Sequence, residues 1–142
     1  PGGGLELGGA GLWRTRGRFG DAAIELEFES TEPDRTHAIV LFDGELQRGV
    51  RCEFQGGGRS TVLWLHAGGR LLAMRDARHD AAARTLRLER REGRVVAAFA
   101  GSPGVEAGAP EPRSGWLGCE VRGPLLVRRA RIEGRPAEPA GP

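Results

Sequence analysis

Apolar and polar residues alternate along several short stretches of this chain. In residues 22–29, one isoleucine, one leucine and one phenylalanine occupy one parity, and three glutamates occupy the other. Because successive side chains of a β-strand point to opposite faces, this pattern predicts a strand with one buried face. Residues 49–55 and 116–121 alternate in the same way and predict two further half-buried strands.

Other stretches predict elements with different surroundings. Residues 37–42 are almost continuously apolar, which indicates an interior strand covered on both faces. Four further runs predict strands, at residues 61–66, 71–74, 86–89 and 95–100, and Gly-containing turns follow the first and the third of them. Residues 101–114 are rich in Pro and Gly and predict a loop, whereas residues 80–83 are compatible with one helical turn.

The last predicted strand changes its phase. Leu125 and Val127 share one parity, but the next apolar residues, Ala130 and Ile132, share the other. A β-bulge near Arg128 would insert the extra residue that this slip requires. With residues 5–16 counted as one strand, we expect about ten strands, enough for an all-β fold of two packed antiparallel sheets.

The size and the ends of the chain indicate one domain. The chain has 142 residues and a mass of 15.2 kDa. We expect a Gly-rich N-terminal segment at residues 1–10, the sandwich at residues 11–134, and a Pro-rich tail or linker to a larger protein at residues 135–142. No apolar run approaches the ~18 residues of a membrane-spanning helix, so we expect no membrane insertion.

The charge pattern does not favour nucleic acid as a partner. All 21 basic residues are arginines, but 19 acidic residues leave a net charge of only +2. Arginines mostly alternate with glutamates, although Arg128, Arg129 and Arg131 cluster without an acid between them. A nucleic-acid interface would need a continuous basic stripe, so we do not expect one. The sequence carries no signal for an oligomeric state.

Two cysteines fall on the apolar parity of alternating runs. Cys52 and Cys119 should therefore point into the sandwich. They could pair in an oxidising compartment, or they could be free buried residues, which is common for small hydrophobic side chains. The sequence leaves both possibilities open, because a bridge requires Cα atoms within ~7 Å.

The order of these elements resembles a known superfamily. The segments that carry the resemblance are Gly11-Leu12-Trp13, Ile24-Glu25-Leu26-Glu27-Phe28-Glu29, Gly49-Val50-Arg51-Cys52-Glu53-Phe54, the pair at 86–97, and the closing strands at 115–121 and 127–134. Over residues 11–134 the chain is similar to the concanavalin A-like jelly rolls, and most similar to laminin-G-like domains and bacterial 3-keto-disaccharide hydrolase-type domains. The resemblance implies one convex and one concave sheet, a glycan or protein ligand on the concave sheet, and an extracytoplasmic location.

One set of polar residues predicts a ligand face. If Leu63 and Leu65 face the core, then Trp64 and His66 face outward together, beside the outward residues of the preceding strand. That second group consists of Arg51, Glu53 and Gln55. An indole beside charged groups can stack on a sugar ring while hydrogen bonds hold its hydroxyl groups.

The three tryptophans need not share one role. Trp64 could instead belong to the core, because tryptophan is usually largely buried. Trp13 and Trp116 each follow or adjoin a glycine at the start of a strand, and we expect both to be core anchors.

A second set of residues predicts a different activity. The Glu25-Leu26-Glu27-Phe28-Glu29 segment resembles the Glu-x-Asp-x-Glu strand of the retaining glucanases that share this fold. Residues i and i+2 of a strand lie ~7 Å apart, and flexible side chains could approach the ~5.5 Å between the two carboxyl groups of a retaining glycosidase. The alternative to catalysis is a solvated face of an antiparallel strand. We therefore favour a non-catalytic module and keep a glycoside-processing hydrolase as its rival.

Metal binding has little support in the pattern. Asp76 and Asp80, together with Asp43, could contribute to a Ca²⁺ site, but calcium requires six to eight oxygen ligands. The three histidines show no zinc-ligand spacing. We expect no other cofactor.

Overall fold

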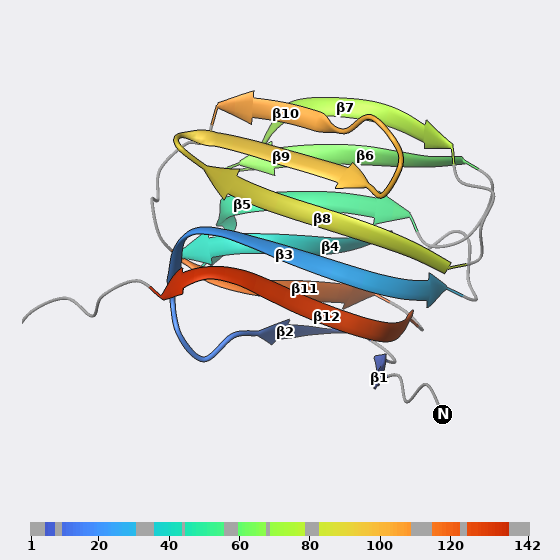
Figure 1. The fold of residues 1–142 in the computed structure, drawn as a ribbon, viewed down its shortest axis with the longest axis horizontal. Helices are drawn as coiled ribbons and strands as arrows, with labels where there is room; N and C mark the ends of the chain where they lie inside the picture. Colours follow the sequence, from blue (N-terminus) through green and yellow to red (C-terminus); the bar gives the residue numbers. More distant parts are fainter. Residues whose placement is uncertain are drawn as a thin grey trace, which may run out of the picture.

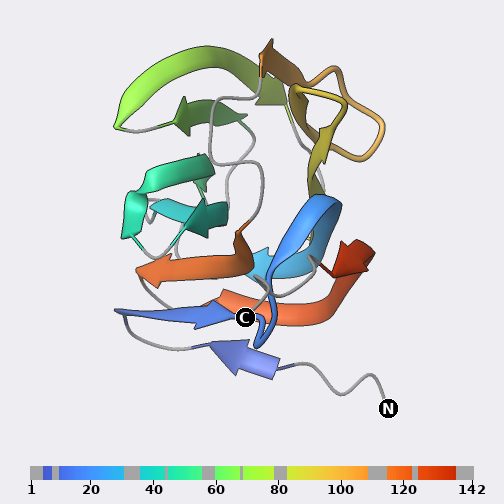
Figure 2. The same ribbon diagram turned by 90° about the vertical axis from the view of Figure 1, so that its left-hand side faces the viewer.

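The computed structural model describes residues 5–7, 10–30, 36–43, 45–55, 60–67, 69–78, 83–108, 115–122 and 125–136. These residues form twelve β-strands in two antiparallel six-stranded sheets, and no helix occurs among them. The predicted fold class, an antiparallel β-sandwich, is confirmed. Figure 2 shows the two sheets as two layers.

We name the sheets by their place in Figure 1, where the front sheet faces the viewer. The front sheet has the order β1 (Leu5–Leu7), β12 (Leu125–Pro136), β3 (Phe19–Ser30), β8 (Ala83–Arg91), β9 (Arg94–Phe99) and β10 (Val105–Gly108). The back sheet has the order β2 (Ala10–Arg14), β11 (Trp116–Arg122), β4 (Thr36–Asp43), β5 (Glu45–Gln55), β6 (Ser60–Ala67) and β7 (Arg70–Arg78).

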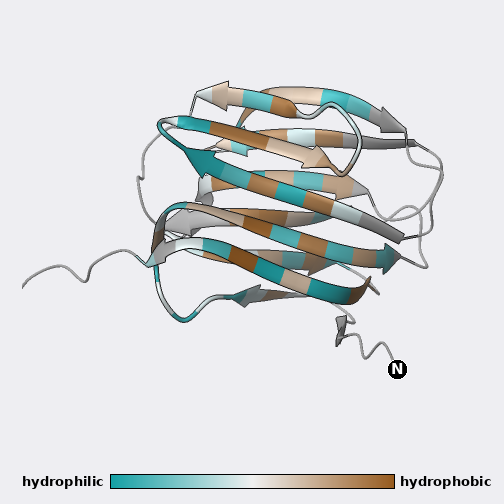
Figure 3. Ribbon diagram, in the orientation of Figure 1, coloured by the Kyte–Doolittle hydropathy of each residue, from teal (hydrophilic) through white to brown (hydrophobic). Residues whose placement is uncertain are grey.

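Alternating side chains build the core between the sheets. Ile24, Leu26 and Phe28 of β3 are at most 1% exposed, as their parity predicts. Phe28 contacts aromatic rings of both sheets: its ring centroid lies 4.8 Å from that of Phe54 in the back sheet and 6.4 Å from that of Phe99 in the front sheet. Bands of hydrophobic and hydrophilic residues accordingly alternate along β3, β8 and β12 in Figure 3.

Strand β4 is the interior strand that its apolar run predicts. It pairs with β11 on one side and with β5 on the other. Ala38, Ile39 and Val40 are all 0% exposed, although their side chains alternate between the two faces of the sheet. Both faces of β4 are therefore covered.

The phase slip near the C-terminus is a β-bulge. In the pairing of β12 with β3, Val127 lies opposite Phe28 and Arg129 lies opposite Glu27, so Arg128 is the extra residue. Beyond the bulge, Ile132 packs against the core. The predicted position of the bulge is confirmed.

A tight turn joins β8 to β9. Its two residues, Glu92 and Gly93, both have positive φ, at 51° and 77°. Two consecutive positive φ values are typical of a type I′ turn, whose twist matches that of the flanking strands. The backbone N–H of Glu92 also donates to the Asp21 carboxylate at 3.1 Å, which ties the turn to the start of β3.

Two details of the fold differ from the sequence prediction, and a third predicted element lies mostly outside the described residues. The predicted loop at 101–114 contains β10, which pairs with β9. Residues 5–16, counted as one strand, are two strands that belong to opposite sheets, β1 and β2. The helical turn considered at 80–83 falls mostly outside the described residues, and β8 begins at Ala83.

The two cysteines point into the core, as predicted, and are free. Cys52 and Cys119 both lie opposite Ile39 of β4, on its two sides. Their Cα atoms are therefore two strand spacings apart, ~10 Å, which exceeds the ~7 Å limit for a disulfide. Burial raises the pKa of both thiols, that of Cys119 to about 12, so both remain protonated and unreactive.

Candidate functional site

Four of the predicted ligand-binding residues lie side by side on the outer face of the back sheet. In the pairing of β5 with β6, Arg51 lies opposite His66 and Glu53 lies opposite Trp64. The flanking Leu63 and Leu65 are completely buried, so Trp64 and His66 face outward as predicted. We call Arg51, Glu53, Trp64 and His66 the back-sheet cluster.

Ion pairs hold the charged members of this cluster in place. Arg51 Nη2 lies 3.1 Å from Glu53 Oε1 and 2.6 Å from a second carboxylate described below. His66 Nε2 lies 3.5 Å from Glu53 Oε2, makes no hydrogen bond among the described residues and forms an ion pair only when the ring is protonated. The three side chains are between 14% and 24% exposed, so the pairs are only partly screened by water. The side chain of the fifth predicted residue, Gln55, lies outside the described part of the structure, and its backbone ends β5 opposite Thr36.

The structure adds Glu120 of β11 to this cluster. Arg51 Nη2 donates to Glu120 Oε2 at 2.6 Å, the shorter of its two ion pairs. To reach Glu120 from β5, the Arg51 side chain must pass over β4, whose outward residues there are the small Ala38 and Val40. The Arg51 side chain and Trp116 together cover Ala38 and Val40, which explains why both are completely buried although they lie on an outer face.

Sequence reasoning missed Glu120 for a physical reason. The alternation in residues 116–121 places Glu120 on an outward face, but it does not show which strand becomes the neighbour of β11. Arg51 and Glu120 are 69 residues apart in the chain. Only the pairing of β11 with β4 brings them together.

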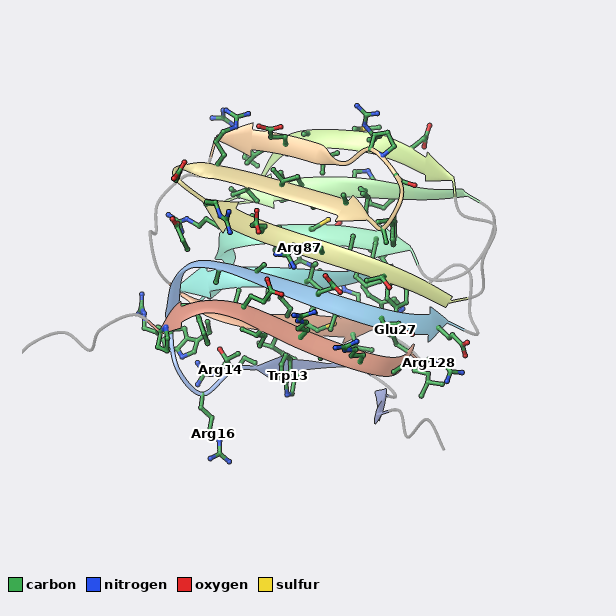
Figure 4. All side chains as sticks on the ribbon, viewed as in Figure 1. Trp13, Arg14, Arg16, Glu27, Arg87 and Arg128 are labelled. Atoms are coloured by element: carbon green, nitrogen blue, oxygen red, sulfur yellow. The ribbon has the colours of Figure 1, made fainter. Side chains whose placement is uncertain are left out.

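Neither of the expected core tryptophans belongs to the buried core. Trp13 is 39% exposed on β2, an edge strand, where no neighbouring strand covers it (Figure 4). Trp116 packs against Ala38 and Val40 on the outer face of the back sheet. Two guanidinium groups lie over its ring, with Arg14 Cζ at 4.7 Å and Arg18 Cζ at 4.9 Å from the ring centroid. The prediction that these two residues anchor the core is therefore wrong.

The carboxylates of the alternative, catalytic reading lie on the opposite side of the molecule. Glu25, Glu27 and Glu29 point outward from β3 on the front sheet, where Glu27 is labelled in Figure 4. Glu25 Oε2 accepts a hydrogen bond from Arg87 at 3.3 Å, and Glu29 Oε2 accepts one from Arg128 at 2.8 Å. Two of the three carboxylates are thus bonded to arginines.

Arg87 is the centre of this front-sheet network. Its guanidinium also donates to Glu89 at 2.9 Å and to Glu133 at 3.1 Å. The hydrogen bond from Arg87 lowers the pKa of Glu133, which favours the charged carboxylate. A cleft of about 720 Å³ adjoins the network, lined by residues of β3, β8 and β12 that include Asp21, Arg90 and Gly134, but not by the glutamates of 25–29.

The described residues do not form a metal site. No group of three or more His, Cys, Asp or Glu side chains among them could hold an ion. Asp76, one of the three calcium candidates, is exposed on β7. Asp80 and the side chain of Asp43 fall outside the described part. Within the same limits, the structure contains no helix long and apolar enough to span a membrane.

No protein-family model matches the sequence, and a search of curated proteins finds no relative. Several solved structures share the fold. A carbohydrate-binding module of Bacillus subtilis, CBM66, superposes with a TM-score of 0.71 at 12% identity, over 94% of this chain and 93% of that one. The galectin LEC-6 of Caenorhabditis elegans gives 0.60 at 16% identity, over 90% and 95%. A β-glucanase of Bacillus licheniformis gives 0.67 at 9% identity, over 94% and 79%.

These similarities confirm the resemblance in fold. The chain shares its two-sheet jelly-roll fold with these solved neighbours, which include a carbohydrate-binding module, a galectin and a glucanase. At such low identity the likeness shows the architecture alone. The finer resemblance to laminin-G-like domains and 3-keto-disaccharide hydrolase-type domains stays a prediction.

Proposed function

We propose that this chain is a non-catalytic module that binds a glycan on the outer face of its back sheet. The observation that carries the proposal is the position of Trp64, whose indole stands outward beside Glu53, with Arg51 and His66 in the next register position. Two structural neighbours, a carbohydrate-binding module and a galectin, support the same class of ligand.

The chemistry of the back-sheet cluster suits a saccharide. An indole face packs well against the C–H groups of a sugar ring, and its N–H remains available as a donor. Glu53 can accept hydrogen bonds from sugar hydroxyl groups, while Arg51 and His66 can donate to ring or hydroxyl oxygens. Because Arg51 is already bonded to Glu120, the charged groups are ordered before the ligand arrives, which reduces the entropy cost of binding.

A glycan array followed by calorimetry tests this proposal. We expect the wild-type protein to bind at least one glycan class and the Trp64→Ala variant to bind it at least about ten-fold more weakly, equivalent to about 1.4 kcal/mol. Val96→Ala is the matched control, since Val96 is also an outward apolar residue, 38% exposed, but on the front sheet. Equal affinity of the Trp64→Ala and Val96→Ala variants would contradict the proposed face.

The rival function is hydrolysis of a glycoside by the carboxylates of residues 25–29. Its support is the β-glucanase among the structural neighbours. Against it stands the bonding of Glu25 and Glu29 to arginines, which suits a self-neutralised surface better than a nucleophile and acid pair. A hydrolysis screen of β-glucans with wild type and Glu25→Gln decides the matter: turnover that disappears in the variant would favour the enzyme. A protein that neither binds nor cleaves glycans would instead be a spacer or a binder of protein.

A further inference from the structure

Three arginines occur within five residues at the connection from β2 to β3. Arg14 ends β2, and Arg16 and Arg18 follow in the turn that leads to Phe19. Arg14 and Arg16 are exposed, and Arg16 projects away from the ribbon in Figure 4. We call these three residues the arginine turn. Together with Trp116 they form the end of the back-sheet face opposite to Trp64.

Hydrogen bonds fix the backbone of the arginine turn. Thr15 Oγ1 donates to the carbonyl of Gly17 at 2.8 Å and accepts from the N–H of Leu117 at 3.2 Å. The N–H of Thr15 donates to the carbonyl of Leu117 at 2.8 Å, and Phe19 and Gly115 exchange two backbone hydrogen bonds. The turn is thus attached to β11 at both ends, and the arginines project from a supported backbone.

Trp116 organises two of the three guanidinium groups. Arg14 and Arg18 both lie over its ring, at 4.7 Å and 4.9 Å. Each cation–π contact attracts a guanidinium group to the ring face and restrains a side chain that would otherwise be mobile. Gly118 makes this arrangement possible, because a Cβ at that position would lie 2.2 Å from the carbonyl oxygen of Trp13 and would push β2 away.

Two arginines of the turn, Arg14 and Arg16, differ from several arginines that are paired with carboxylates elsewhere. Arg51, Arg87 and Arg128 all have carboxylate partners within 3.3 Å. Arg14 and Arg16 have no carboxylate within ion-pair distance among the described residues. Guanidinium groups that are ordered by a ring and a fixed turn but lack a local counter-ion can bind an external anion.

We propose that the arginine turn and Trp116 form an anion-binding subsite for the carboxylate or sulfate groups of an acidic saccharide. The choice of a saccharide rests on the proposed function, because the subsite lies on the same outer face as the back-sheet cluster. The two tryptophans are four residues apart along the strand direction and three strands apart across the sheet, so they lie roughly 20 Å from each other. A chain of several sugar rings can span that distance.

The experiment compares acidic saccharides with neutral counterparts of the same backbone. Oligogalacturonate and its methyl ester share one sugar backbone, but only the former carries free carboxylates; dextran sulfate and dextran likewise share a backbone, and only the former carries sulfate groups. Calorimetry at low and at physiological ionic strength measures the affinity of each for wild type and for the double variant Arg14→Gln with Arg18→Gln. The double variant Arg91→Gln with Arg129→Gln removes the same charge from exposed positions of the front sheet and is the control.

We expect at least one acidic saccharide to bind wild type at least ten-fold more tightly than its neutral counterpart, with a preference that weakens as salt is added. Substitution of Arg14 and Arg18 should remove this preference, whereas the control should keep it. Thermal unfolding should remain cooperative in both double variants, and the loss of the two contacts with the Trp116 ring should make the Arg14 and Arg18 variant the less stable of the two.

Four results would overturn the proposal. The first is equal affinity of wild type for the charged and neutral forms, and the second is an equal loss of the preference for the charged form in the control variant. The third is displacement of the acidic saccharide by polyglutamate as effectively as by the saccharide itself, and the fourth is no binding of either acidic saccharide to wild type.

Trp64→Ala separates this proposal from the proposed glycan-binding function. If only Trp64→Ala weakens binding, the glycan face stands and the anion subsite fails. If only the Arg14 and Arg18 substitutions weaken it, the anion subsite stands and the face around Trp64 fails.

Discussion

A buried histidine should make the stability of this protein depend on pH. His37 of β4 points into the sandwich and is 1% exposed, with its ring centroid 5.6 Å from that of Phe54. Its Nδ1 accepts a hydrogen bond from the backbone N–H of Arg122 at 3.4 Å. Its buried Nε2 has no hydrogen-bond partner among the described residues. A proton added to this ring would create a charge in an apolar environment.

The direction and size of the effect follow from the pKa. Burial lowers the pKa of His37 from 6.5 to about 4. The unfolded chain therefore takes up a proton as the pH falls below about 6.5, whereas the folded chain does so only near pH 4. Folding stability must decrease across this interval and level off below it. At about 1.4 kcal/mol per pH unit, the full loss is at most about 3.5 kcal/mol.

Urea unfolding of wild type and of His37→Leu, at about pH 7.5 and about pH 4.5, isolates this contribution. Every carboxylate titrates in both proteins, so its effect cancels in the difference between their free energies of unfolding. We expect that difference to shift by about 2–3 kcal/mol in favour of the leucine variant at the lower pH. A difference that stays constant between the two pH values would refute the reasoning, because the histidine would then titrate alike in both states.

Three further predictions concern the back sheet and the core. Arg51→Met should keep the cover over β4 but remove one ion pair from each of two partly buried carboxylates, Glu53 and Glu120, with a loss of about 1–3 kcal/mol in urea unfolding that shrinks in acid. Gly118→Ala should lower the melting temperature by several degrees and weaken acidic-saccharide binding, because its Cβ meets the Trp13 carbonyl oxygen. A reducing agent should leave the melting temperature unchanged, since Cys52 and Cys119 are too far apart to form a disulfide.

The strands themselves could be predicted because alternation is a local signal. In residues 22–29 and 49–55, the apolar side chains alternate with polar ones, and burial of the apolar set fixes which side of the strand faces the core. Neighbouring segments do not alter this assignment. Short or edge strands lack enough residues to show a phase. Strand β10 has only four residues in a Pro- and Gly-rich stretch, and β2 has five at the edge of its sheet. The role expected for Trp13 was wrong for that reason.

The candidate site was only half predictable, because strand order is a property of the whole chain. Arg51, Glu53, Trp64 and His66 belong to one hairpin, so their proximity follows from local pairing. Glu120 and Trp116 come from β11, which pairs with β4 in the back sheet. Three consecutive front-sheet strands, β8, β9 and β10, come before β11 in the chain. No periodicity within residues 116–121 contains that information.

The distribution of charge explains why the two outer faces should differ in function. The strands of the front sheet are rich in Glu and Arg, and their register places Arg131, Glu25 and Arg87 in one row. The opposite charges therefore attract one another within the protein. A surface of this kind stabilises the sandwich modestly. Because its charged groups pair with one another, it offers few of them to a ligand.

On the back sheet, the aromatic residues and small side chains of β4, β6 and β11 interrupt the alternation of Glu and Arg. Arginines at that face stack on a ring or span a strand, and two of them, Arg14 and Arg16, have no carboxylate partner in the described part of the chain. We therefore expect a ligand to bind on the outer face of the back sheet, where the regular alternation of Glu and Arg is interrupted.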